Sequence, residues 1–126
     1  MSNIKSITMD PAGPALVVKA AIEAYPVPMA ANLWQYTKDQ VFEKKPGVFT
    51  PGVPTVTLDP PPQVTGRFFL LEGAVIALTD GLTSPYAVVI NVRQGDKVLF
   101  EGPPTTGGSG QISDTDIPFN FRFALA

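Results

Sequence analysis

Histidine and cysteine are both missing from this 126-residue chain. Without histidine, it lacks the commonest general base near neutral pH and the commonest ligand of transition metals. Without cysteine, it has no disulfide framework, no thiolate nucleophile and no cysteine-ligated metal. We therefore expect no enzymatic activity, and no ordinary zinc, copper or non-haem iron site.

Charge is also scarce, because charged residues make up 16% of the chain and the net charge is −2. Nucleic-acid binding requires a basic surface, so we expect no nucleic-acid partner. No apolar run approaches the roughly 18 residues of a membrane-spanning helix. The N-terminus lacks the long apolar run of a signal peptide. We therefore expect no membrane span and a cytoplasmic location by default, with leaderless export left open.

Proline and glycine, in contrast, are abundant, with 14 and 11 residues. Helices tolerate proline only in their first turn, so few windows of this chain suit a long helix. Hydrophobic residues make up 44% of the sequence and include eight phenylalanines. A chain of this length and composition can bury its own core, which predicts a single domain over residues 1–126.

The clearest pattern is a period of two in the closing segment. Apolar side chains take every second position there, namely Ile117, Phe119, Phe121, Phe123 and Leu125. A second alternating set consists of Tyr86, Val88, Ile90 and Val92. Such alternation is typical of strands that lay one face over a core. We expect these two faces to meet between two sheets.

Turn residues divide the rest of the chain into further short strands. We predict strands at residues 3–9, 15–25, 32–37, 53–58, 67–71, 74–78, 86–93, 97–101 and 117–125. Residues 15–25 also fit a helix that begins after Pro14, but their alternation is cleaner and favours a strand. Gly95 and Asp96 predict a tight hairpin turn. We expect residues 38–45 to form a turn or a single helical turn.

Six prolines fall within residues 46–62 and favour extended backbone at the surface. This segment is interpreted as an ordered crossover between two sheets, with an arm that clasps a neighbouring subunit as the alternative. Together these features predict an all-β, antiparallel β-sandwich of jelly-roll or immunoglobulin-like type. We expect about seven or eight strands and a long Pro-rich connection in the middle.

Two groups of residues suggest binding sites. Asp114 and Asp116 lie two positions apart in a loop and could offer oxygens to calcium, with Asp80 or Thr79 from another loop. The EF-hand pattern is absent, so a polar turn is the alternative. Trp34 and Tyr36 share one face of a predicted strand. They could form a platform for a sugar ring or a proline-rich peptide, or anchor the core.

The glycine-rich residues 107–110 lack the lysine of a phosphate-binding loop and indicate a flexible connection. Loops on a rigid β scaffold often carry recognition, which points to residues 79–85 and 105–116. We therefore predict a non-catalytic binding module for a carbohydrate, peptide or protein. The ligand-binding candidates are Trp34, Tyr36, Asp80, Thr105, Asp114 and Asp116.

The alternative function is structural. In that case the chain is a subunit of a particle, tail or inclusion body, and it forms homo-oligomers through sheet edges and the Pro-rich arm. The identity of a ligand, the strand order and the oligomeric state cannot be read from the sequence.

Overall fold

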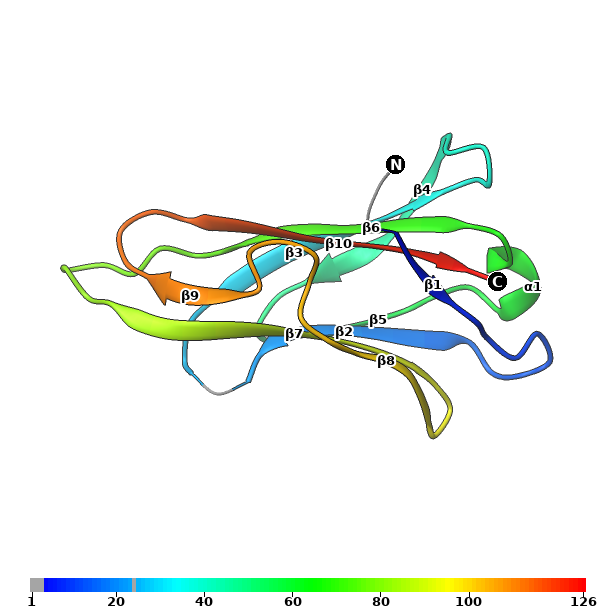
Figure 1. Ribbon diagram of the computed structural model, residues 1–126, viewed down its shortest axis with the longest axis horizontal. Helices are drawn as coiled ribbons and strands as arrows, with labels where there is room; N and C mark the ends of the chain where they lie inside the picture. Colours follow the sequence, from blue (N-terminus) through cyan, green and yellow to red (C-terminus); the bar gives the residue numbers. More distant parts are fainter. Residues whose placement is uncertain (1–3, 24) are drawn as a thin grey trace.

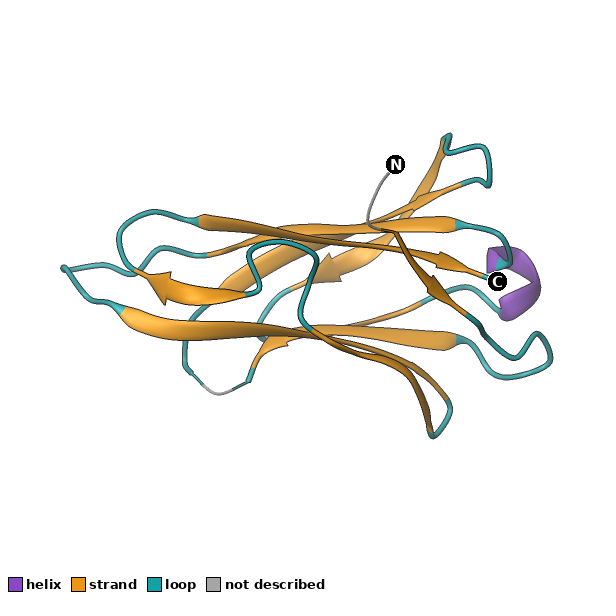
Figure 2. Ribbon diagram, in the orientation of Figure 1, coloured by secondary structure: helices purple, strands orange, loops and turns teal. Residues whose placement is uncertain are grey.

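The computed structural model describes residues 4–23 and 25–126, which form ten strands and one short helix (Figures 1 and 2). The strands are β1 (Ile4–Ile7), β2 (Leu16–Ile22), β3 (Met29–Tyr36), β4 (Phe42–Phe49), β5 (Thr55–Thr57), β6 (Phe68–Val75), β7 (Ser84–Gln94), β8 (Lys97–Gly102), β9 (Ser109–Ile112) and β10 (Ile117–Leu125). The helix α1 (Pro61–Val64) spans four residues. No helix among the described residues is long and apolar enough to cross a membrane.

Two sheets pack face to face (Figure 1). Sheet A has the strand order β1-β10-β6-β3-β4, and sheet B has the order β5-β2-β7-β8. Strand β9 pairs with the first part of β7, from Ser84 to Ala87. Every pairing is antiparallel except that of β1 with β10. The expected all-β sandwich is confirmed, with ten strands in place of seven or eight.

The two alternating faces predicted from the sequence line the core. Phe119, Phe121 and Phe123 of β10 are at most 3% exposed. The apolar side chains of β7 that belong to the same core cluster are Tyr86, Val88, Ile90 and Val92. Because β10 lies in sheet A and β7 in sheet B, these side chains fill the space between the sheets.

Seven of the nine predicted strands are confirmed, most of them with small shifts in their bounds. Strand β2 buries Leu16, Val18 and Ala20 on one face, which settles the choice between strand and helix in favour of a strand. Asn3 and Ala24, at the ends of two predicted strands, lie outside the described residues. Gln94 pairs with Lys97 across a two-residue turn, and Gly95 has a φ of 58°, as a tight hairpin requires.

Three predictions about elements were wrong. The predicted strands at residues 67–71 and 74–78 are replaced by one strand, β6, which runs through Gly73 without a turn and ends at Val75. Within residues 38–45, the first part forms the expected turn, but the chain from Phe42 onward forms the edge strand β4. Lys44, Lys45 and Pro46 are tolerated there because one side of the strand has no partner among the described residues. Strand β9 lies within residues 105–116, a segment that we expected to be a loop.

The Pro-rich segment also contains more regular structure than expected. It includes the end of β4 in sheet A, strand β5 in sheet B and the beginning of α1. The chain crosses between the sheets through a turn closed by Thr50 and Val53, whose backbone N–H groups each donate to the other's carbonyl at 3.0 Å.

Candidate functional site

The acidic residues predicted to bind a cation lie in two loops at the end of the sandwich opposite α1 (Figure 1). The loops are joined, since the Leu78 N–H donates to the carbonyl of Ser113 at 2.6 Å. Asp116 Oδ1 accepts a hydrogen bond from the Ala77 N–H at 2.7 Å. Asp114 and Asp80 are exposed. The described residues contain no group of three or more acidic, histidine or cysteine side chains that could hold a metal ion. The Asp116 side chain thus links the two loops. Among the described residues, Asp80 does not join Asp114 and Asp116 in a group that could hold calcium.

Thr105 lies away from these acidic residues. Its backbone N–H donates to the carbonyl of Asn120 at 2.8 Å, and Thr106 forms an isolated bridge with the same residue. The loop that follows β8 is thereby attached to β10. Thr105, the acidic loops and the aromatic pair consequently do not form one site.

Trp34 and Tyr36 lie on the outer face of sheet A, toward the end of β3. Leu33 and Gln35, which alternate with them, are at most 2% exposed and face the core. Phe42 of β4 contacts both aromatic residues edge to face, with centroid distances of 6.1 Å. Trp34 is therefore no core anchor. Lys45 Nζ lies 5.1 Å from the Trp34 centroid and covers part of the ring that a sugar would need.

A different surface offers more polar groups to a ligand. On the outer face of sheet B, four polar side chains stand in register across four strands, in the order Thr55, Lys19, Asn91 and Glu101. They border a pocket of about 450 Å³, which we call the sheet B pocket. Its lining consists of Val17, Lys19, Glu23, Thr55, Val89, Asn91, Arg93, Gly95 and Glu101.

Asn91 is the most unusual residue of the sheet B pocket. The residue is 9% exposed, and its Nδ2 donates to Glu101 Oε2 at 2.9 Å. Its Oδ1 is buried and has no hydrogen-bond partner among the described residues. Buried polar atoms are nearly always hydrogen-bonded, and leaving one unpaired costs roughly 1–3 kcal/mol. The wall of the pocket thus contains an unpaired acceptor, which a ligand hydroxyl reaches only when the side chains that cover it move aside.

Sequence reasoning missed the sheet B pocket. The alternation of residues 15–25 places Lys19 and Glu23 on the face away from the core, and Asn91 and Arg93 interrupt an otherwise apolar strand. These positions were a usable signal of polar side chains on an outer face. However, they come together only because β2 and β8 pair with opposite sides of β7. That pairing depends on strand order.

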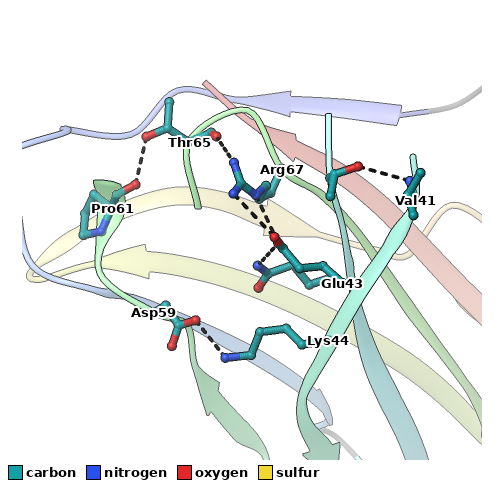
Figure 3. Close-up of polar contacts among 9 residues, drawn as sticks. Val41, Glu43, Lys44, Asp59, Pro61, Thr65 and Arg67 are labelled. Atoms are coloured by element: carbon teal, nitrogen blue, oxygen red, sulfur yellow. Dashed lines mark hydrogen bonds and ion pairs between the residues drawn. The ribbon is translucent and has the colours of Figure 1, made fainter. Parts of the chain in front are cut away.

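The network around Glu43 ties the edge strand β4 to the segment around α1 (Figure 3). Arg67 Nε donates to Glu43 Oε1 at 3.0 Å, and Gln35 Nε2 donates to the same oxygen at 2.7 Å. These hydrogen bonds, that of Arg67 first, hold the pKa of Glu43 below its ordinary value of 4.5. A second ion pair joins Lys44 to Asp59 at 2.8 Å. Gln35 Oε1 is buried and has no hydrogen-bond partner among the described residues, but Arg67 and Gln35 both donate to Glu43, so we assign the network a structural role.

No protein-family model, curated protein or solved structure matches the chain. Function must therefore be argued from the chemistry of the surfaces described above.

Proposed function

We propose that this protein is a non-catalytic binding domain that recognises a neutral carbohydrate in the sheet B pocket. The observation that carries the proposal is the buried, unpartnered Oδ1 of Asn91 at the pocket wall. A hydroxyl group of a ligand can donate to this oxygen and remove the cost of leaving it unpaired.

The chemistry of the lining suits a sugar. Lys19 and Arg93 supply hydrogen-bond donors, and Glu23 and Glu101 supply acceptors. A sugar hydroxyl both donates and accepts, so either kind of group can bind it. Val17 and Val89 supply apolar surface for the C–H groups of a ring. The volume of about 450 Å³ falls in the range of about 300–1,000 Å³ that is usual for small-molecule sites.

The charge balance of the pocket favours a neutral ligand. Its two basic residues are offset by two acidic ones. Lys19 Nζ lies 3.2 Å from Glu23 Oε1, so this pair neutralises itself. An anionic ligand such as a phosphate would meet Glu23 and Glu101 together with the basic groups, whereas an uncharged sugar meets no net charge.

The proposal of a non-catalytic role rests on the residue types present. The chain has no histidine. Two carboxylates alone can hydrolyse glycosides, and the pocket contains Glu23 and Glu101. However, Glu23 is paired with Lys19 and Glu101 with Asn91, so both carboxylates already have partners. We expect sugars to leave the protein unchanged.

A glycan array followed by titration of the bound sugars tests this function. We expect Asn91→Ala to weaken binding at least about tenfold, the effect of losing one buried hydrogen bond of roughly 1.4 kcal/mol. Arg93→Ala should also weaken it. Asn32→Ala is the matched control, because Asn32 lies on β3 in the other sheet. An array without specific binding, or equal affinity for Asn91→Ala and the parent protein, would contradict the proposal.

Assembly into a larger particle is the second candidate, and edge strand β4 favours it. Phe42 and Val48 are 55% and 44% exposed there, and Val41 just before the strand is 61% exposed. However, Lys44, Lys45 and Pro46 occupy the middle of β4, and such residues discourage pairing between edges. Light scattering at high protein concentration separates the candidates, because a strict monomer rules out assembly. A large closed oligomer that Phe42→Lys dissociates would instead support it.

A further inference from the structure

A second pocket lies on the outer face of sheet A, in the sheet opposite the proposed sugar site. Its volume is about 130 Å³, and we call it the Arg122 pocket. The apolar part of its lining consists of Ile4 from β1, Tyr36 from β3, Phe68, Phe69 and Leu70 from β6, and Phe123 from β10. Arg122 of β10 and Gln40 of the β3–β4 loop supply its polar groups.

Arg122 is held among apolar neighbours. In the sheet register it stands directly between Ile4 of β1 and Leu70 of β6. Its Nε is buried and has no hydrogen-bond partner among the described residues. None of the three ion pairs formed by those residues includes Arg122. A guanidinium cannot lose its charge at any ordinary pH, so an anion bound in the pocket beside Arg122 offsets a charge that no ion pair of the described residues neutralises.

The lining specifies the chemistry of that acceptor. No acidic side chain lines the Arg122 pocket, so its net charge is positive and an anion is favoured. The planar fork of arginine matches a carboxylate, which can accept two parallel hydrogen bonds. The apolar walls suit a hydrocarbon body, and a cavity of about 150 Å³ lined by apolar side chains holds one benzene ring.

We propose that the Arg122 pocket binds a small apolar monocarboxylate. The carboxylate lies on the Arg122 guanidinium, and the ring or short acyl chain packs against Tyr36, Phe68 and Leu70. This site is separate from the sheet B pocket and does not depend on the proposed sugar binding.

The test compares two probes of equal shape on the intact protein. Benzoate carries the carboxylate and benzamide does not, so titration by NMR or calorimetry isolates the charge. We expect saturable binding of benzoate, with benzamide at least about tenfold weaker, because a charge-assisted hydrogen bond contributes roughly twice as much as a neutral one. Hexanoate should bind as well if the apolar walls accept an acyl chain.

Two variants locate the binding. Arg122→Gln should remove the preference for benzoate over benzamide, while Arg93→Gln on sheet B should leave it unchanged. A thermal melt checks that both variants fold. Equal binding of the two probes to the parent protein would overturn the proposal without any variant. It would also be overturned if benzoate showed no saturable binding, or if Arg122→Gln kept the full preference for the carboxylate.

Discussion

Phe121 is the single residue whose substitution best tests the core. Its ring stacks on Phe100 of β8 at a centroid distance of 4.7 Å and on Phe123 at 5.6 Å. We expect Phe121→Ala to lower the free energy of unfolding by about 3–5 kcal/mol, because it opens a cavity in a packed interior. Phe42→Ala is the control, since Phe42 is 55% exposed. Urea unfolding measures both. A near-neutral Phe121→Ala would mean that the phenylalanine face is exposed for binding.

Glu43 gives the chain a predictable response to acid. Its pKa is lower in the folded protein than its ordinary value of 4.5, owing first to the hydrogen bond from Arg67. Its stabilising effect is therefore complete above pH 4.5 and is lost as the pH falls through the lower, folded-state pKa. We expect Glu43→Gln to melt below the parent protein at pH 7, and the two melting curves to converge in acid. A gap that is independent of pH would contradict this assignment.

The roles of single residues were partly predictable. Alternation alone placed Phe121 inward and Trp34 and Tyr36 on the face opposite Leu33, because side chains in a strand alternate strictly between the two faces. The burial of the outward-facing Asn91 could not be predicted, since it depends on the neighbouring side chains of β2 and β8.

Among the elements, β6 shows how a glycine can mislead. Glu72 and Gly73 suggest a turn, but a Cβ at Gly73 would lie 2.7 Å from the Cα of Ala31, and the carbonyl oxygen of Ala30 would be closer still. Glycine is required here because two backbones approach closely within the sheet.

This close approach makes Gly73→Ala destabilising. We expect it to lower the free energy of unfolding by about 1–3 kcal/mol, as overpacking does. The matched control is Gly52→Ala, because a Cβ at Gly52 meets no atom within 4 Å and should change stability by less than about 1 kcal/mol. Chemical denaturation of both variants provides the measurement. Equal stabilities would mean that β6 is interrupted at Gly73.

Edge strand β4 is an element that the residue pattern does not predict. Lysines and a proline within residues 44–46 resemble a turn, yet an edge strand accepts them because one row of its backbone groups has no partner. The register also shifts near Trp34, which breaks the simple alternation of β4. A sequence without a known strand order gives no means of telling such an edge from a loop.

For the whole molecule, the class of fold followed from two alternating faces, whereas the candidate site did not. The order β5-β2-β7-β8 aligns Thr55, Lys19, Asn91 and Glu101, which are far apart in the chain. Pairing between distant strands depends on the packing of the entire core. The residue pattern within one strand therefore does not predict which strand pairs with it. Turn residues identify loops directly in a sequence, whereas strand order determines which residues of different strands lie side by side on a sheet face.

The most direct measurement of the central claim is a titration of isotopically labelled protein with neutral sugars, followed by NMR. Glucose, galactose, mannose and N-acetylglucosamine serve as the probes. If a sugar binds in the sheet B pocket, we expect saturable chemical-shift changes for at least one of these sugars. The changes should affect the Asn91 side-chain amide and the backbone amides around Lys19 and Arg93. If no sugar produces saturable shifts, or if they cluster instead in the loops at residues 79–85 and 113–116, the account is contradicted.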